Sequence, residues 1–228
     1  MATTQDIRAG GTETAASQIY HVIRDKIIFL QQPPGSTMSE LETAAQLGVS
    51  RTPVREAFIR LAREKMLLIS PQRRTAVAKI SLERVRQEQF LRESLEWSVL
   101  ESFIANPTQA GLDGLAADLA CQRQALETGD ALRFRRYDDS FHRKLYAATG
   151  NLFSYQVIRR ACFDYQRLRS LSAEDATVQA LNLAQHEELL RLIRSRKPAE
   201  ARALLLTHLR RLFDEIDAMR AKYPLYFE

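Results

Sequence analysis

The sequence has little cysteine and no long apolar run. Its two cysteines among 228 residues, Cys121 and Cys162, do not form a Cys-x-x-Cys motif. A disulfide framework is therefore not indicated, and we expect two buried thiols in a reducing compartment. No stretch approaches the length that spans a bilayer, and residues 1–11 are polar without the apolar centre of a signal peptide. We expect a cytoplasmic protein with no membrane partner.

Most of the chain also lacks an excess of positive charge. Residues 81–228 hold 22 basic and 21 acidic side chains, whereas residues 1–80 hold 11 and 7. Within the first part, residues 46–74 carry seven basic and two acidic side chains. A basic excess confined to one segment favours a polyanionic partner for that segment. The composition as a whole, 45% hydrophobic and 27% charged, is that of a soluble globular protein.

The first 80 residues predict short helices followed by one hairpin. Residues 1–13 are expected to be a disordered arm. The expected elements are helices over about 14–30, 40–47 and 51–65, and strands over 66–70 and 75–80. The second helix opens with a capping box, in which Ser39 precedes Glu42 by three positions. This order of elements is typical of a winged helix-turn-helix, which we assign to residues 14–80.

The third of these helices carries the basic face. Gly48 is predicted to end the preceding helix in the left-handed conformation, and Ser50 to cap the next one through its hydroxyl. The positions with helical spacing that predict a buried stripe are Val54, Ala57, Phe58 and Leu61. Arg51, Thr52 and Arg55 then face away, where they suit phosphates and guanine edges. The alternative is an ordinary surface helix with solvated arginines.

From residue 81 onward no further strand pattern appears. We expect about six helices in an all-α bundle with short loops. Their predicted spans are about 82–106, 109–127, 130–149, 152–171, 173–195 and 198–222, the fifth being capped by Ser172. The fold class is therefore mainly α, an N-terminal winged helix-turn-helix followed by a helical domain over residues 81–228.

Four polar side chains of this bundle are predicted to point inward. Asp138 and His142 fall on or beside the apolar stripe of one helix, and His186 and His208 share faces with leucines on two others. A single inward histidine is more often a satisfied core residue, and Asp138 alone suggests a salt bridge with an arginine of the bundle. Together, however, the four form a ligand set suited to zinc, nickel, manganese or iron.

The run Leu-Gly-Val-Ser-Arg-Thr-Pro-Val-Arg-Glu at residues 47–56 closely resembles the recognition helix of the GntR family of bacterial transcription regulators. The resemblance implies that Arg51 and Arg55 read bases in a major groove and that Thr52 touches phosphate. The residues expected to contact double-stranded DNA are Ser50, Arg51, Thr52, Arg55, Arg73 and Arg74. The last two lie at the wing tip, where the alternative is a solvated turn.

The chain lacks glycine at three positions where members of that family usually have it. Family members usually have glycine near Arg74 and at the position of Lys65, and Leu30 also replaces a common glycine. Because Leu30 stands where glycine is common, we expect the turn after the first helix to have a different shape.

The segment from Asp138 to His142, followed by Gly150-Asn151 and later by His186 and His208, resembles the helical effector domain called FCD in the FadR branch of that family. The resemblance implies that Asp138, His142, His186 and His208 hold a divalent metal, zinc before nickel, manganese or iron. It also implies a small carboxylate effector beside the metal. Arg92 is expected either to bind that carboxylate or to pair with Glu96 one turn away.

These resemblances predict a homodimeric, ligand-responsive transcription regulator, a repressor rather than an enzyme, that binds a near-palindromic operator. Two alternatives stay open at this point. One is a metal-dependent hydrolase, since a metal with an open position can activate water. The other is a DNA-binding dimer with no ligand response.

Overall fold

A computed structural model describes residues 14–70 and 75–228. The chain divides into two compact units. One comprises the residues up to Ser81 together with Tyr223–Glu228, and the other is Leu82–Lys222. No described helix combines the length and the apolarity needed to cross a membrane.

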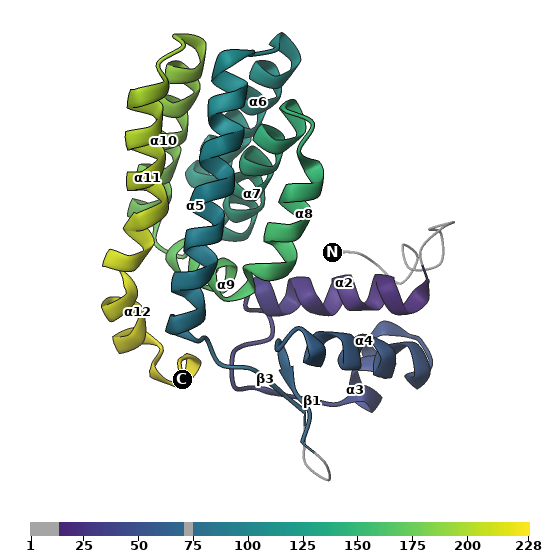
Figure 1. The fold of residues 1–228 in the computed structure, drawn as a ribbon. Coiled ribbons are helices and arrows are strands. Elements are labelled where there is room, and N and C mark those ends of the chain that lie inside the picture. The colour runs from purple at the N-terminus through teal and green to yellow at the C-terminus, as the bar shows by residue number, and fades with distance from the viewer. Residues whose placement is uncertain (1–13, 71–74) are drawn as a thin grey trace. The chain divides into compact units, whose positions relative to one another are not determined.

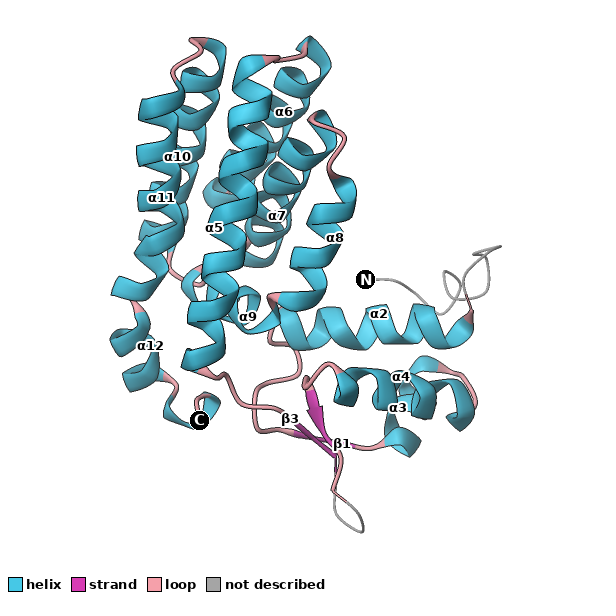
Figure 2. Ribbon diagram, in the orientation of Figure 1, coloured by secondary structure: helices cyan, strands magenta, loops and turns pink. Residues whose placement is uncertain are grey.

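The N-terminal unit has the predicted winged helix-turn-helix architecture. Its described helices are α2 (Ala15–Ile28), α3 (Glu40–Leu47) and α4 (Arg51–Arg63). Its strands are β1 (Thr37–Met38), β2 (Leu67–Leu68) and β3 (Thr75–Val77), which form an antiparallel sheet in the order β1-β3-β2. The hairpin of β2 and β3 was predicted, whereas β1 was not. All named strands of the described residues belong to this unit (Figure 2).

Local signals explain how α3 leads into α4. Ser39 caps α3 by accepting the Glu42 N–H at 3.4 Å, and Gly48 ends it with a φ of 65°. Ser50 occupies the N-cap position of α4, but its hydroxyl makes no capping hydrogen bond, so that part of the prediction was wrong. The predicted apolar stripe of α4 is buried, because α2 and α3 pack against it.

Two positions where family members usually carry glycine keep the left-handed backbone. Leu30 has a φ of 58° and Lys65 a φ of 62°. At the second position the Lys65 N–H bonds Ala62 O and the Met66 N–H bonds Leu61 O, both at 2.9 Å, which closes the end of α4. The turns are therefore retained at the cost of an unfavourable conformation for two residues that carry a Cβ atom.

The C-terminal residues return to this N-terminal unit. Ile80 forms a parallel bridge with Phe227, in which the Ile80 N–H donates to Tyr226 O at 2.8 Å and the Glu228 N–H donates to Ile80 O at 3.1 Å. Phe227 and Ile80 are both buried. The sequence analysis had placed these last residues with the helical domain.

The second unit is all-helical, as predicted, but has more helices than expected. Over residues 82–222, all of which are described, they are α5 (Leu82–Ala105), α6 (Gln109–Glu127), α7 (Ala131–Ala148), α8 (Leu152–Ala161), α9 (Phe163–Ser172), α10 (Ala176–Arg194), α11 (Pro198–Asp214) and α12 (Ile216–Lys222) (Figure 1). The fourth expected helix is broken at Cys162 and the last at Glu215. Helix α10 is capped by Asp175, whose carboxylate accepts the Thr177 N–H at 2.7 Å, and not by Ser172.

The break at Cys162 separates a surface helix from a buried one. Every residue of α9 except Arg169 is buried, whereas α8 buries only Tyr155 and Ile158. At the start of α9 the Tyr165 N–H donates to the carboxylate of Glu88, on α5, at 2.6 Å. A side chain from a distant helix therefore satisfies this helix start, which explains why the local pattern did not reveal it.

Helix α7 turns one face into the helical unit. It packs against α5, α6, α8 and α10. Its apolar stripe, which includes Phe134, Phe141 and Leu145, is buried as predicted. The polar residues that interrupt this stripe are consequently buried between α7 and its neighbours.

Candidate functional site

The four inward polar residues of the sequence analysis converge in the helical unit. Asp138 and His142 come from α7, His186 from α10 and His208 from α11. All four are buried, and one ligand atom from each lies within 4.8 Å of the others. The distance from His186 Nε2 is 3.2 Å to His208 Nε2 and 3.8 Å to Asp138 Oδ1. No other group of at least three potential metal ligands of this kind occurs among the described residues.

The rings of His186 and His208 are held from behind by amide side chains. Gln122, on α6, places its amide oxygen 3.1 Å from His186 Nδ1, and its amide nitrogen donates to the Tyr137 carbonyl at 3.3 Å. Gln185 places its amide oxygen 2.8 Å from His208 Nδ1. Because an amide oxygen only accepts, these contacts assign the proton of each ring to Nδ1 and leave each Nε2 with a bare lone pair.

This arrangement fits a bound cation. Two Nε2 lone pairs that face each other at 3.2 Å repel, and a metal ion between the ligands would remove that repulsion. The Nε2 atom of His142 is also buried without a hydrogen-bond partner, and its Nδ1 lies 3.1 Å from Glu96 Oε2. Burial lowers the pKa of His186 to about 3 and holds that of His208 well below its ordinary value. The imidazoles are therefore neutral at pH 7, the form that binds metals.

Asp138 supplies a negative charge. Burial by itself would raise its pKa, but Arg169, followed by His186, His142 and Arg135, holds the pKa well below the ordinary value. Its Oδ2 accepts from Arg169 of α9 and lies 3.5 Å from Arg135 Nη1, whereas Oδ1 faces His186. The salt bridge considered in the sequence analysis is thus present, and it leaves one carboxylate oxygen toward the histidines.

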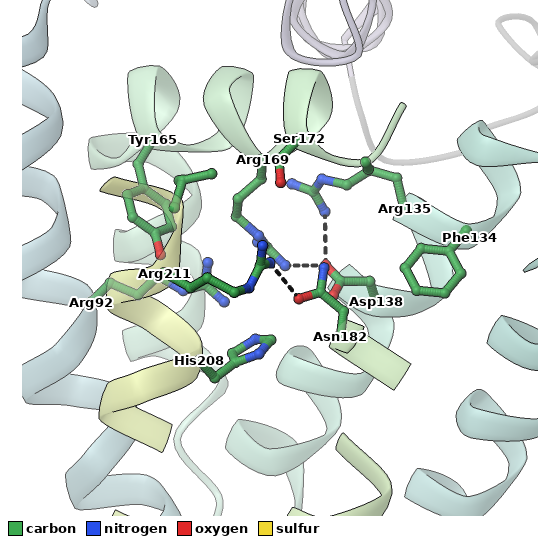
Figure 3. Close-up of a pocket in the computed structure, with 12 residues that line it drawn as sticks. Arg92, Phe134, Arg135, Asp138, Tyr165, Arg169, Ser172, Asn182, His208 and Arg211 are labelled. Atoms are coloured by element: carbon green, nitrogen blue, oxygen red, sulfur yellow. Dashed lines mark hydrogen bonds and ion pairs between the residues drawn. The ribbon is translucent and has the colours of Figure 1, made fainter. Parts of the chain in front are cut away.

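A small polar pocket lies beside the four residues. Asp138 and His208 line it together with four arginines, Arg92, Arg135, Arg169 and Arg211, whose side chains come from four different helices (Figure 3). Its volume is about 30 Å³, which is room for about two water-sized groups. The pocket therefore suits a short, anionic ligand rather than a large one.

The expected pair of Arg92 with Glu96 is present, and binding of a carboxylate by Arg92 stays a prediction. Its Nε donates to Glu96 Oε1 at 2.7 Å, which is the predicted pair one turn away. Its Nη2 is buried and has no hydrogen-bond partner. Sequence reasoning missed Arg135, Arg169 and Arg211, although Arg135 precedes Asp138 by three positions and so shares its helix face.

The described part of the predicted DNA-contacting set is exposed. Ser50, Arg51, Thr52 and Arg55 lie in the first turns of α4 and are open to solvent. Arg51 also lies 3.5 Å from the Glu40 carboxylate of α3. Arg73 and Arg74, predicted for the wing tip, lie outside the described residues.

Known protein families match both parts of the chain, the part with the exposed start of α4 and the part with the buried Asp/His cluster. Residues 15–77 match the bacterial regulatory proteins of the gntR family, and residues 89–211 match the FCD domain. A Streptomyces ambofaciens protein described as an uncharacterized HTH-type transcriptional regulator in an unstable DNA locus is 33% identical, covering 94% of this chain and 90% of its own. The HTH-type transcriptional repressor RspR of Escherichia coli K12 is 28% identical over 98% of both chains.

Solved structures show the same fold. The Escherichia coli protein McbR/YncC superposes with a TM-score of 0.79 at 20% identity, covering 93% of this chain and all of that one. A putative GntR regulator from Rhodococcus sp. RHA1 superposes with a TM-score of 0.73 at 21% identity, covering 90% of this chain and 95% of that one. The chain belongs to the GntR family of transcription regulators and carries an FCD domain behind its winged helix-turn-helix.

Proposed function

We propose that this regulator is a repressor that binds a near-palindromic operator as a homodimer and leaves it when a small carboxylate binds beside a divalent metal. Residues 14–80 would bind DNA, and the helical domain within residues 81–228 would bind the effector and dimerise. The observation that carries the proposal is the buried cluster of Asp138 and three histidines beside an arginine-lined pocket. Two relatives are named as repressors, RspR of E. coli and NanR of Cronobacter sakazakii, which supports repression rather than activation.

The exposed start of α4 supports the DNA-binding part of the proposal. Arg51 and Arg55 project from the helix N-terminus, where guanidinium groups reach guanine edges and phosphates. Operators selected from random double-stranded DNA should bind Arg55→Ala at least about tenfold more weakly than the parent. Arg194→Ala removes the same charge from an exposed site of the helical unit and should leave affinity nearly unchanged. Equal losses in both variants would contradict base reading by Arg55.

The metal part of the proposal assigns the four buried side chains as ligands. Bound there, a divalent ion would supply a positive charge and an open position for a carboxylate oxygen. Protein purified without a metal-affinity tag should contain about one divalent ion per chain by mass spectrometry. His186→Ala should lose it, and His21→Ala, which changes an exposed histidine of the other unit, should keep it. Absence of metal in the parent after incubation with zinc, nickel or manganese would overturn the assignment.

Effector control is tested separately from metal binding. Small carboxylates should release the metal-loaded protein from its operator, because a ligand that favours the DNA-incompetent state shifts the population toward it. The His186→Ala protein should stay bound to DNA at the same carboxylate concentrations. Metal-free protein with unchanged DNA affinity and no response to any carboxylate would instead identify a DNA-binding dimer without an effector.

Dimerisation is proposed for the helical unit. It exposes Phe90 on α5 and Phe153 on α8 by 75% and 76%, which leaves two large apolar side chains available to a partner subunit. Sedimentation analysis should give about twice the mass of the 26.1 kDa chain. A monomer at the concentrations that bind DNA would contradict the two-fold operator.

A further inference from the structure

The last six residues complete the N-terminal unit from the far end of the sequence. The chain passes between the two units twice, from Ser81 to Leu82 and from Lys222 to Tyr223. Residues 223–228, which we call the C-terminal strap, therefore belong to the N-terminal unit but follow helix α12 of the helical unit directly. The strap is a second covalent connection between the units, in addition to the one that leads into α5.

Backbone hydrogen bonds and a buried ring hold the strap in the N-terminal unit. The two hydrogen bonds of the bridge pair both the N–H and the carbonyl of Ile80 with the strap. Phe227 is 4% exposed and Ile80 is fully buried. The carbonyl oxygen of Leu225 lies 3.6 Å from the point where a Cβ atom on Gly35 would stand, so the strap also borders the loop before β1. Undocking the strap would expose apolar surface and leave both backbone groups of Ile80 unpaired, which is costly.

The docked strap lies beside the base of the wing hairpin. Ile80 follows the last residue of β3, Val77, by three positions. Val77 is itself tied to the loop before β1, because the Gly35 N–H donates to Val77 O at 2.9 Å and the Val77 N–H donates to Ser36 O at 2.8 Å. The strap therefore stabilises the base of a hairpin whose tip, outside the described residues, is predicted to contact DNA.

The other end of the strap leads back to the pocket through α12 and α11. Helix α11 carries His208, a candidate metal ligand, and Arg211, which lines the pocket. Where α11 ends, Glu215 accepts hydrogen bonds from Arg211 and from Ser172, the latter at 2.6 Å. These three positions of α11 are spaced three and four residues apart, so they share one helix face that leads from the pocket to the start of α12.

We propose that the C-terminal strap couples the helical unit to DNA binding. Docking of Phe227 at Ile80 keeps the wing hairpin in its DNA-competent form, and a shift of α11 and α12 releases the strap and weakens operator binding. This regulatory role rests on the proposed function, because a ligand at the pocket has to favour the released state in order to shift α11. The docking itself requires neither a metal nor an effector.

Operator binding and amide exchange of the full chain test the docking. Phe227→Ala should weaken binding to operators selected from random duplex DNA by at least about tenfold. It should also speed exchange of the Ile80 amide by at least about tenfold. Phe227→Leu keeps an apolar side chain and should recover most of both. Leu225→Ala changes a strap residue that is 74% exposed and should match the parent. Parent-like operator binding and Ile80 exchange in Phe227→Ala would overturn the strap.

A slack connection separates coupling from simple stabilisation. Eight glycine and serine residues inserted between Lys222 and Tyr223 keep every strap residue but lengthen the connection to α12 by up to about 28 Å. Glu215→Ala frees the start of α12 and should weaken operator binding of the parent chain by about threefold or more. In the slack chain the same substitution should have no effect. An identical insertion after Gly129, in an exposed loop of the helical unit, should leave the effect of Glu215→Ala intact.

The outcomes separate the coupling from the proposed function. Equal losses from Glu215→Ala in the parent and slack chains, or no loss in the parent, overturn coupling through the strap. Helicity and Trp97 fluorescence of each variant are measured first, and Glu215→Gln, which keeps an acceptor for Ser172, replaces an alanine variant that does not fold. A parent without bound metal refutes the proposed metal site and leaves these measurements valid. A parent that binds no selected operator refutes the proposed DNA binding, and Ile80 exchange in the same variants then decides docking and coupling.

Discussion

Glu88 makes the stability of the helical unit depend on pH. Its carboxylate is buried on α5, where Oε2 accepts the Tyr165 N–H at 2.6 Å and Oε1 has no hydrogen-bond partner. Burial, with the nearby charge of Asp164 adding to it, raises the pKa of Glu88 from 4.5 to about 8. The folded chain therefore holds this proton more tightly than the unfolded chain does.

The sign and size of the effect follow from that difference. Between pH 4.5 and 8 the folded state binds the extra proton, so the free energy of unfolding falls as the pH rises through this window. At about 1.4 kcal/mol per pH unit, the loss has an upper bound of about 5 kcal/mol. Below pH 4.5 the contribution is fully present, because Glu88 is protonated in both states.

Glu88→Gln removes the titration and keeps an oxygen for the Tyr165 N–H. The single tryptophan, Trp97, lies on the same helix, so its fluorescence follows urea unfolding of the helical unit. We expect nearly equal stability of variant and parent at pH 4.5, and a variant that is more stable by a few kcal/mol at pH 8.5. Glu101→Gln changes an exposed site on α5, and its free energy of unfolding should follow that of the parent from pH 4.5 to 8.5. Parallel stability curves for parent and Glu88→Gln from pH 4.5 to 8.5 would refute the reasoning.

Two further predictions concern the backbone and the ligands. Lys65→Gly should stabilise the N-terminal unit by up to about 1 kcal/mol, because Lys65 has a φ of 62°, whereas Gly48→Ala, at a φ of 65°, should destabilise it. Thermal unfolding of both variants measures this, and a change of the same sign in both would contradict it. Gln122→Leu removes the acceptor behind His186 and should weaken zinc binding by about 10- to 100-fold in a chelator competition while leaving operator binding intact. Unchanged zinc affinity would show that Gln122 does not orient the ring.

Helical periodicity accounts for the part of the candidate site that could be predicted. His186 and His208 share their faces with leucines, and Asp138 interrupts an apolar stripe, so their inward orientation follows from positions within one helix. Convergence of the three helices was a hypothesis from this shared orientation, and resemblance to the FCD domain added the assignment of the four side chains to one metal site. Arg169 was missed because its carboxylate partners, Asp138 and Asp139, lie on another helix. Arg135 and Arg211 pair with carboxylates three or four residues away, a spacing that an exposed helix face shows equally well.

The sequence by itself determined the winged helix-turn-helix and the all-helical class of the second unit. Capping residues, the left-handed Gly48 and the stripe through Val54 and Phe58 act over a few residues, so local chemistry specifies them. The tertiary structure alone decided the break at Cys162, the pairing of Phe227 with Ile80 and the gathering of arginines from four helices around one pocket. Each of these depends on partners tens of residues away in the chain, and only folding brings such partners within reach of a hydrogen bond.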